Sequence, residues 1–496
     1  MSKPRSDLQP NTVDYENLPL VTANGFREYD ARWLFGKEIN LLGVQALGLG
    51  LGAYLHEVGA PKVVTGHDYR SYSLSIKQAL TLGLMNAGCE VLDIGLATTP
   101  AAYYAQFALD CPAVAMVTAS HNENGWTGVK MGASKPLTFG PDEMTRLKEI
   151  VLGGEAKARA GGSYAFVENF RERYLQAVTA GHKLSRPIKV VAACGNGTAG
   201  AFAPEALRRI GAEVIAMDAE LDYTFPKYNP NPEDLHMLHA MADAVRAHGA
   251  ELCVGFDGDG DRCGVVDDKG EEIFADKVGV LLARDLSARI PNAQFVVDVK
   301  STGIYLMDPV LKKNGVRVDY WKTGHSHMKR RTADLKAVAG FEKSGHYFFN
   351  APLGRGYDDG ILAAIAVLEM LDHAGKKMSA LVESLPKTWL SPTMSPFCPD
   401  DRKYAVVAAI TQEYEGIKAR GEKVLGQTIA SIVTVNGVRV TLEDGTWCLV
   451  RASSNKPSLV VVVESPTSDV NMHAIFADLD GRLSKHPEVG EYDQKI

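Results

Sequence analysis

The sequence predicts an α/β protein built from mostly parallel sheets, with a smaller α+β unit near its C-terminal end. Short apolar strands alternate with segments of helical periodicity over most of the chain. After about residue 390 the pattern changes to strands joined by tight turns. At roughly 150 residues per domain, 496 residues correspond to three or four domains.

Strand–helix–strand units recur at similar spacing before residue 390. Each begins with a short apolar run, and a segment of helical periodicity and further apolar strands follow. In one unit a loop directly follows the first strand, and the helix comes later. This rhythm indicates mostly parallel sheets and repeated units of similar architecture. The units comprise residues 62–95, 187–218, 251–290 and 294–322.

The C-terminal part reads as strands connected by hairpin turns. Residues 423–454 and 458–465 are rich in β-branched residues, and Asn436-Gly437 and Asp444-Gly445 are typical turn pairs. Two proline-rich stretches, 226–232 and 391–400, are linker or loop candidates. The second predicts a domain boundary.

Composition excludes several classes of protein. A net charge of −7 argues against a dominant nucleic-acid surface. Seven cysteines, an odd number without a CxxC pair, argue against a disulfide framework and against a structural zinc site. The polar N-terminal segment predicts a loose tail and no secretory signal, and no run of about 18 apolar residues exists. A cytoplasmic enzyme without membrane or nucleic-acid partners is expected.

Three carboxylates alternate with glycines directly after an apolar strand. Asp257, Asp259 and Asp261, here called the aspartate trio, cannot stay close together without a cation. Magnesium is the predicted guest, because hard cations prefer oxygen ligands. An EF-hand is excluded, since its sixth and twelfth positions would be Arg262 and Asp268 and a strand leads in. A passive acidic turn is the remaining alternative.

A second loop follows the apolar run Val114–Val117. Ser120 and His121 stand at its end, before a glycine-containing turn and Lys130. Ser120 with Glu123 fits a helix capping box, so the local interpretation is a helix start. A chemical role for the serine is the competing interpretation.

Residues 195–200 match G-x-G-x-x-G after a strand and before a helix, and Asp218 ends the next strand. This pattern supports a dinucleotide-dependent oxidoreductase as an alternative function. A tight strand-to-helix turn needs the same glycines, and hydride transfer does not require a loop of three carboxylates. The aspartate trio therefore favours the structural interpretation of the glycines.

Three further polar segments could recognise a small anionic sugar. Residues 451–457 offer a guanidinium, hydroxyls and an amide to a phosphate, although a polar hairpin loop would look the same. Residues 341–346 combine a carboxylate, a hydroxyl and an imidazole, which can bind sugar hydroxyls or form a capped turn. Residues 323–327 lead into a basic run, Lys329–Arg331, that is typical of a solvated face.

These segments together resemble the α-D-phosphohexomutase family, in particular its bacterial phosphomannomutase/phosphoglucomutase branch. The resemblance rests on four motifs in order: TASHN at 118–122, DGDGDR at 257–262, EKSGH at 342–346 and RASSN at 451–455. It extends over nearly the whole chain. Further matches are residues 26–32, 66–70, Lys130, Lys300 and 323–326.

The resemblance implies four domains around a central cleft, three α/β domains of related topology and a smaller α+β domain. The expected boundaries are a flexible tail at 1–20, domain 1 with the phosphoserine loop at 21–168, domain 2 with the metal loop at 169–272, domain 3 with the sugar loop at 273–388 and domain 4 with the phosphate loop at 389–496.

The resemblance also implies the reaction. Ser120 would be phosphorylated and would complete the shell of one Mg²⁺ held by the aspartate trio. The phosphoserine would convert a hexose 1-phosphate, of mannose or glucose, into the 6-phosphate through a hexose 1,6-bisphosphate, which also primes the enzyme. The implied catalytic residues are Ser120, Lys130, Arg262, His325 and Arg32, with His121 nearby. The implied substrate-binding residues are Tyr29, Lys300, Gly324, Glu342, Ser344, His346, Arg451, Ser453, Ser454 and Asn455.

The chain departs from the family pattern at three places. Ser454 and Asn455 stand where the family commonly has Asn or Gly and then Thr, Phe341 replaces a glycine, and Glu123 replaces a proline. None of these changes removes a group that the reaction needs. A phosphoglucosamine mutase and an inactive sugar-bisphosphate-binding relative are the alternatives within this fold. Sugar phosphates are the expected partners, and the chain is expected to be a monomer or a weak dimer.

Overall fold

The structure is a computed structural model that describes residues 3–454 and 456–496. The chain divides into two compact units. Met1–Val278 and Ser344–Ser379 form the first unit, and Gly279–Lys343 and Ala380–Ile496 form the second. Mixed α/β sheets and a C-terminal antiparallel sheet confirm the predicted fold class.

Six strands form the first sheet of the first unit. They are β1 (Ala31–Leu34), β2 (Lys62–His67), β3 (Glu90–Leu96), β4 (Ala113–Val117), β5 (Trp126–Gly132) and β6 (Ser163–Phe166). Their order is β1-β5-β4-β2-β3-β6. The strands β4, β2, β3 and β6 are parallel, whereas β5 is antiparallel to β4 and β1 is antiparallel to β5. The carboxyl ends of β2, β3 and β4 therefore meet at one edge of the sheet.

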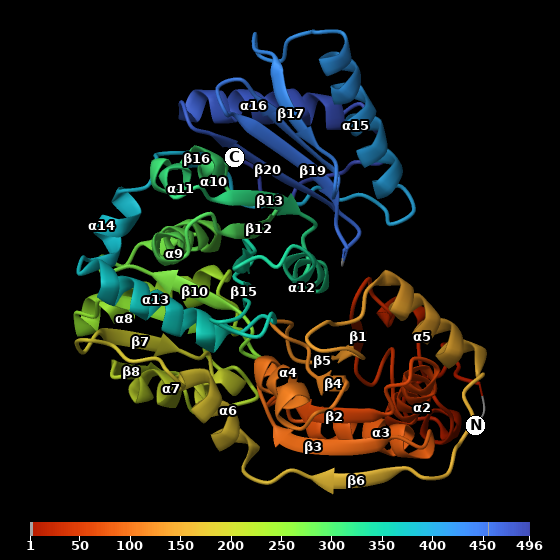
Figure 1. Cartoon of the computed structure of the whole chain (residues 1–496). Coiled ribbons are helices and arrows are strands. Elements are labelled where there is room, and N and C mark those ends of the chain that lie inside the picture. Colours follow the sequence, from red (N-terminus) through yellow and green to blue (C-terminus); the bar gives the residue numbers. More distant parts are fainter. Residues whose placement is uncertain (1–2, 455) are drawn as a thin grey trace. The chain divides into compact units, whose positions relative to one another are not determined.

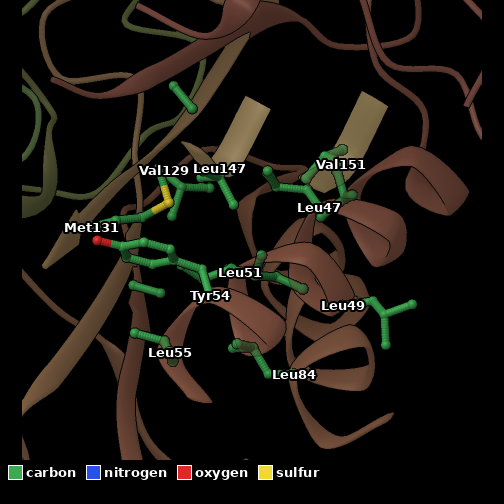
Figure 2. Close-up of a cluster of buried hydrophobic side chains, with 14 of the residues drawn as sticks. Leu47, Leu49, Leu51, Tyr54, Leu55, Leu84, Val129, Met131, Leu147 and Val151 are labelled. Atoms are coloured by element: carbon green, nitrogen blue, oxygen red, sulfur yellow. The ribbon is translucent and has the colours of Figure 1, made fainter. Parts of the chain in front are cut away.

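Helices pack on this sheet through an apolar core. They are α2 (Leu41–Glu57), α3 (Ser73–Asn86), α4 (Thr99–Ala108) and α5 (Pro141–Gly153). In Figure 1, α2 and α3 lie side by side. Glycines permit this approach: a Cβ on Gly48 would lie 2.3 Å from Leu80 O, and one on Gly83 would lie 2.2 Å from Gln45 O. Figure 2 shows leucines of α2 together with Leu84, Met131 and Val151 in the buried cluster.

The N-terminal segment is fastened to the sheet domain. Helix α1 (Val13–Asn17) and the 3-10 turn η1 (Ala23–Gly25) lie within or just after the segment expected to be a tail. Leu8 and Leu20 are buried. Asn40 accepts a hydrogen bond from Leu20 N at 3.0 Å and donates one to Leu18 O at 3.0 Å. Arg5 N also donates to Pro19 O at 2.9 Å, so the segment is fastened from about Arg5 onward, which a polar sequence alone does not reveal.

The second sheet of the first unit has five strands in the order β11-β10-β9-β7-β8. The strands are β7 (Lys189–Ala193), β8 (Glu213–Met217), β9 (Leu252–Phe256), β10 (Cys263–Val266) and β11 (Glu272–Ile273). Strands β8, β7 and β9 are parallel, and β10 and β11 are antiparallel additions at one edge. Both faces of β7 and β9 are buried, as expected for parallel strands.

Several helices accompany this second sheet. Helix α8 covers one face through Met237, Met241 and Val245. Helix α13 contacts β9 and β10, as well as α6 and α7. The turn η2 (Thr198–Ala201) follows β7, and β15 (Tyr347–Phe349), which is no strand of this sheet, also belongs to the first unit. The helices are α6 (Phe170–Thr179), α7 (Ala203–Arg209), α8 (Leu235–His248) and α13 (Gly360–Ala374).

The second unit begins with a parallel arrangement. Strand β12 (Gln294–Asp298) lies between β13 (Arg317–Trp321) and β14 (Ala339–Phe341), and all three run parallel. Helix α12 (His325–Asp334) contacts all three strands. The other helices of this part are α9 (Ala275–Arg289), α10 (Ile304–Met307), α11 (Pro309–Lys313) and α14 (Met378–Glu383). Helices α9 and α14 each begin with residues assigned to the first unit and end with residues assigned to the second.

The C-terminal part of the second unit is an antiparallel sheet in the order β16-β20-β19-β18-β17. Gly437 and Gly445 have positive φ angles in the turns that join its strands, as the sequence predicts. Helices α15 and α16 both pack against β19 (Figure 1). The elements are β16 (Trp389–Leu390), β17 (Ile429–Val433), β18 (Val438–Leu442), β19 (Trp447–Ala452), β20 (Leu459–Ser465), α15 (Lys403–Ala419) and α16 (Asp469–Leu483).

The seven cysteines are all buried free thiols. Among the residues that the structure describes, none of the helices has the length and apolar character to cross a membrane.

Candidate functional site

The site begins where β4 ends. Residues 118–125, here called the serine loop, connect β4 to β5 and contain Ser120, whose side chain is buried. No helix starts within this loop, so the capping-box interpretation of Ser120 and Glu123 is wrong. Ser120 lies instead at the carboxyl edge of a parallel sheet, where functional side chains commonly gather.

The aspartate trio lies against the serine loop. Residues 257–262, the aspartate loop, follow β9 and precede β10. Ser120 Oγ donates a hydrogen bond to Asp257 Oδ2 at 2.9 Å, across 137 positions of sequence. A Cβ on Gly258 would lie 2.5 Å from Ser120 O, so the two backbones touch. The fold therefore brings the serine and the carboxylates together.

Two buried cations balance part of this negative charge. Lys130 Nζ on β5 donates to Asp259 Oδ2 at 2.8 Å and also to Asp261 Oδ2. Arg262 donates to Asp257 through Nε at 3.2 Å and through its backbone N–H at 3.2 Å. Three carboxylates thus face two cations, and all five side chains are buried.

The pKa values reflect this imbalance. Burial, reinforced by repulsion from the other two carboxylates, raises the pKa of Asp257. Burial also opposes ionisation of Asp259, but the charge and hydrogen bond of Lys130 outweigh it and lower the pKa of Asp259. Burial would lower the pKa of Lys130, but attraction to Asp259 and Asp261 raises it instead.

The aspartate loop has the donor atoms that a divalent cation needs. One carboxylate oxygen from each member of the trio lies within 4.8 Å of the others. Asp259 Oδ1 and Asp261 Oδ1 are buried and accept no hydrogen bond from any described residue. Oxygens of this kind cost free energy unless a cation or donor satisfies them. The residues present therefore fit Mg²⁺, a hard ion with oxygen ligands.

Further side chains surround Ser120. Arg32 on β1 donates to Asp30 Oδ2 at 2.9 Å and to Asn122 Oδ1 in the serine loop at 3.0 Å. His121 Nδ1 lies 3.3 Å from Ser120 Oγ. Burial, followed by the charges of Arg262 and Arg32, holds the pKa of His121 well below its usual value. His121 is therefore neutral at neutral pH, beside a cluster of permanent positive charges.

The second half of the predicted sugar loop joins the aspartate loop. Cys263 N donates to Gly345 O at 2.9 Å, and Arg262 forms an antiparallel bridge with His346. His346 Nδ1 lies 2.9 Å from Asp358 Oδ2 and 3.8 Å from Asp261 Oδ1. The carbonyl of Ser344 contacts the aspartate loop, because it lies 3.5 Å from Arg262 Nη1. The buried residue Tyr29 lies in the segment that leads into β1.

The predicted residues of the second unit form two groups. Lys300, Gly324, His325 and Glu342 follow the carboxyl ends of β12, β13 and β14, and Glu342 Oε1 accepts a hydrogen bond from Gly324 N at 2.6 Å. His325 Nδ1 lies 3.2 Å from Lys329 Nζ, so Lys329 belongs to this buried group and not to a solvated face.

The second group is the loop between β19 and β20. Ser453 N donates to Ser458 O at 3.0 Å, and Lys403 Nζ donates to Ser453 O at 2.6 Å. Arg451 Nη1 donates to Ala452 O at 3.0 Å, and Ser454 lies half-buried at the turn. Asn455 lies outside the described residues.

The G-x-G-x-x-G segment has a structural part in this site. Thr198 N donates to Gly258 O at 3.1 Å, and a Cβ on Gly197 would lie 3.2 Å from Gly258 Cα. The motif leads into the short turn η2 and packs against the aspartate loop. This placement favours the structural interpretation of its glycines over a dinucleotide fingerprint.

Residues that sequence reasoning did not single out also shape the site. Thr99 Oγ1 and Thr99 N both donate to Asp259, and Glu233 Oε2 accepts from Arg262 Nη1 at 3.1 Å. Asp358 precedes the N-cap of α13 and pairs with His346. The only sequence signal for Asp358 is its position in an Asp-Asp-Gly run after an aromatic residue, which does not identify its partner.

Comparison with known proteins agrees with the motifs. Four family models match in order: phosphoglucomutase/phosphomannomutase α/β/α domains I, II and III at residues 23–158, 166–270 and 274–389, and the C-terminal domain at residues 398–482. A phosphomannomutase/phosphoglucomutase of Pseudomonas putida is 34% identical over 454 residues, covering 91% of this chain and 93% of that protein.

Two other proteins widen the comparison. A probable phosphoglucosamine mutase of Methanothermobacter thermautotrophicus is 31% identical over 421 residues, covering 84% of this chain and 88% of the relative. A solved structure of a phosphoglucomutase/phosphomannomutase family protein from Burkholderia thailandensis superposes with a TM-score of 0.84 at 28% identity, covering 95% of this chain and 99% of that one. The chain belongs to the phosphoglucomutase/phosphomannomutase family.

Proposed function

We propose that this protein is a phosphohexomutase, an intramolecular phosphotransferase that interconverts hexose 1-phosphate and hexose 6-phosphate, with mannose or glucose as the sugar. The observation that carries the proposal is the hydrogen bond of 2.9 Å from Ser120 Oγ to Asp257, inside a buried cluster of acidic groups. Burying three carboxylates together costs free energy, and the serine hydroxyl beside them lies where a bound cation would bring a phosphoryl group on Ser120 and the carboxylates together.

In the proposed reaction, phosphoserine 120 gives its phosphoryl group to the free hydroxyl of a sugar monophosphate. The bond between Ser120 Oγ and phosphorus breaks, a bond from phosphorus to the sugar oxygen forms, and the hydroxyl proton passes to a nearby base. The bisphosphate turns around, and the same steps in reverse return the other phosphoryl group to Ser120. Phosphate thereby moves between carbons 1 and 6 of the sugar.

The chain's own cations serve this transfer. Lys130, Arg262 and Arg32 place three positive charges around the serine loop, where negative charge spreads over the equatorial phosphoryl oxygens. Arg262 Nη2 is buried and has no hydrogen-bond partner among the described residues, so it is available to donate to a phosphate oxygen.

One Mg²⁺ per chain would be held by the aspartate trio with Ser120, and when bound it supplies additional positive charge beside the phosphoryl group. By resemblance to the family, a hexose 1,6-bisphosphate would prime the enzyme. Lys130, His325 and Arg32 are the proposed residues for proton transfer or for stabilising the negative charge of the phosphoryl group. His121 joins them, because its neutral ring lies 3.3 Å from Ser120 Oγ.

By resemblance to the family, the remaining residues would bind the substrate. Glu342 and Ser344 would bind sugar hydroxyls, and the loop that begins at Arg451 and Ser453 would bind the phosphate that is not transferred. The other proposed substrate-binding residues are Tyr29, Lys300, Gly324 and His346. The domain boundaries predicted above remain part of this proposal. A phosphoglucosamine mutase is the second candidate, because a relative with that name covers 84% of the chain.

A coupled assay tests the proposal. Turnover is measured with mannose 1-phosphate, glucose 1-phosphate and glucosamine 1-phosphate, each with magnesium and a trace of the matching 1,6-bisphosphate. We expect turnover of the mannose or glucose compound that falls by at least about 10³-fold in Ser120→Ala. Ser71→Ala, at an exposed serine of the same unit, is the matched control and should keep full activity. Wild-type turnover by Ser120→Ala would refute the phosphoserine assignment.

A further inference from the structure

Ser120 has an unusual backbone conformation. Its φ angle is +52°, in the left-handed region that residues other than glycine, asparagine and aspartate seldom adopt. Such a conformation costs on the order of 1–3 kcal/mol and persists only where surrounding contacts impose it. The contacts that impose it on Ser120 therefore bear on where its hydroxyl points.

One side chain holds both sides of this residue. Arg70, three residues after the end of β2, is buried, and its Nη2 donates to Ser120 O at 2.8 Å and to Asn122 O at 2.6 Å. Asn122 N donates in turn to Ala119 O at 3.0 Å, which closes the turn. A planar guanidinium suits this task, because its N–H groups have fixed directions.

A carboxylate holds the preceding residues. Asp68 Oδ2 accepts hydrogen bonds from Thr118 Oγ1 at 2.9 Å and from Ala119 N at 3.3 Å. The Thr118 hydroxyl accepts a hydrogen bond from Ser120 N at 2.8 Å. Asp68 thus reaches both peptide groups that precede the Ser120 Cα, one directly and one through Thr118.

The two holding residues are also bound to each other. Arg70 Nη1 forms an ion pair with Asp68 Oδ2, and about 1% of each side chain is exposed. Asp68 Oδ1 accepts from Arg70 N at 3.2 Å and from Ser73 Oγ at the start of α3. The pair is therefore anchored to the first sheet and to a long helix, and presents a rigid surface to the serine loop.

We propose that Asp68 and Arg70 are positioning residues that impose the left-handed conformation of Ser120 and thereby aim its hydroxyl at the aspartate trio. This inference rests on the proposed function, because it assigns the pair a part in phosphoryl transfer by Ser120. The competing explanation is that the pair only stabilises the first sheet, as a buried ion pair between neighbouring elements would.

A second buried ion pair in the same sheet separates these explanations. Lys77 Nζ pairs with Asp93 Oδ2, and the two side chains are 4% and 5% exposed. The pair also joins α3 to the first sheet, but none of its hydrogen bonds reaches the serine loop among the described residues. Lys77→Met is therefore the matched control for Arg70→Met.

The first measurement is turnover with magnesium and the priming bisphosphate. Arg70→Met should lower kcat by about 10²-fold, because a shift of about 1 Å at a reacting group costs that much, and KM for the sugar phosphate should stay within about threefold. Arg70→Lys, which can still reach one carbonyl, should recover part of the loss. Lys77→Met should keep kcat within about threefold of wild type. Equal kcat in the Arg70→Met and Lys77→Met proteins would overturn the proposal.

The second measurement does not depend on catalysis. Glycine accepts a φ of +52° without strain, whereas alanine does not, and both lack the hydrogen bond to Asp257. In an otherwise wild-type chain, replacing alanine by glycine at position 120 should therefore favour the folded state by about fivefold in the unfolding equilibrium. In the Arg70→Met background the loop is free to relax, and the same change should bring no gain. An equal gain in both backgrounds would refute the proposal, whatever the enzyme's substrate. A wild-type protein without mutase activity would instead refute the proposed function, and the comparison of stabilities in the two backgrounds would still test the positioning role of Arg70.

Discussion

Gly258→Ala should reduce turnover by separating the two loops that carry the reaction. The φ angle of Gly258 is not in the left-handed region, so alanine brings no backbone strain there. Its Cβ would lie 2.5 Å from Ser120 O, whereas a carbon and a carbonyl oxygen ordinarily approach to about 3.3 Å. The serine loop and the aspartate loop must therefore move apart by about 0.8 Å. A displacement of this size corresponds to a loss of about 10²-fold in kcat and, through overpacking, to about 1–3 kcal/mol in the free energy of unfolding.

The coupled mutase assay and urea unfolding measure these two quantities. Gly481→Ala is the control, because nothing lies within 4 Å of that Cβ and the residue is inside helix α16. This control should keep wild-type kcat and gain up to about 1 kcal/mol of stability, since alanine favours helices over glycine. A folded Gly258→Ala protein with kcat within threefold of wild type would show that the contact between the loops does not matter for the reaction.

Two other changes test the electrostatics of the first unit. Burial raises the pKa of Asp359 to about 7, so its folded form keeps a proton that the unfolded chain loses near pH 4, and the free energy of unfolding should fall as pH rises from about 4 to 7. Asp359→Asn can still accept a hydrogen bond from Tyr174, and it should remove up to about 4 kcal/mol of that fall. Urea unfolding at pH 4.5, 6 and 8 measures the free energy of unfolding of both proteins. The same dependence on pH in the variant and in the wild type would contradict this prediction. Lys130→Met should lose about 3–5 kcal/mol in EDTA, because the aspartate trio loses its buried partner, and millimolar Mg²⁺ should restore more thermal stability to it than to wild type. Lys77→Met should show no such dependence on Mg²⁺, and an equal response to Mg²⁺ in both variants would argue against a cation at the trio.

Local pattern in the sequence was enough to predict most secondary structure. The strands around residues 62–66, 189–193, 252–256 and 294–298 lie where short apolar runs predicted them, because a strand buried on both faces must be continuously apolar. The C-terminal hairpins were predicted from Gly437 and Gly445, whose positive φ angles few other residues tolerate.

Chemical identity was also predictable where several functional groups are neighbours in sequence. The aspartate trio indicated a cation from its own composition, since repulsion among three close carboxylates needs no knowledge of the fold. The order of four motifs then predicted the family, which the family models and relatives confirm.

Sequence pattern failed where an interaction joins distant segments. The Ser120–Glu123 spacing favoured a helix cap, but the carboxyl ends of β4 and β9 place Ser120 against Asp257 instead. The GxGxxG pattern at 195–200 could not show that Gly197 packs on Gly258. For the same reason, the match of residues 66–70 to the family pattern did not show that Arg70 binds the serine loop.

The sequence by itself determined where most strands and helices lie, which chemical groups are present and to which family the chain belongs. Only the tertiary structure decided which of those groups meet, that Ser120 takes a left-handed conformation and that Asp68 and Arg70 hold it there. The physical reason is that backbone preference and hydrophobic periodicity act over a few neighbouring residues. The contact between Ser120 and Asp257 instead joins two residues that are 137 positions apart and follow strands of two different sheets.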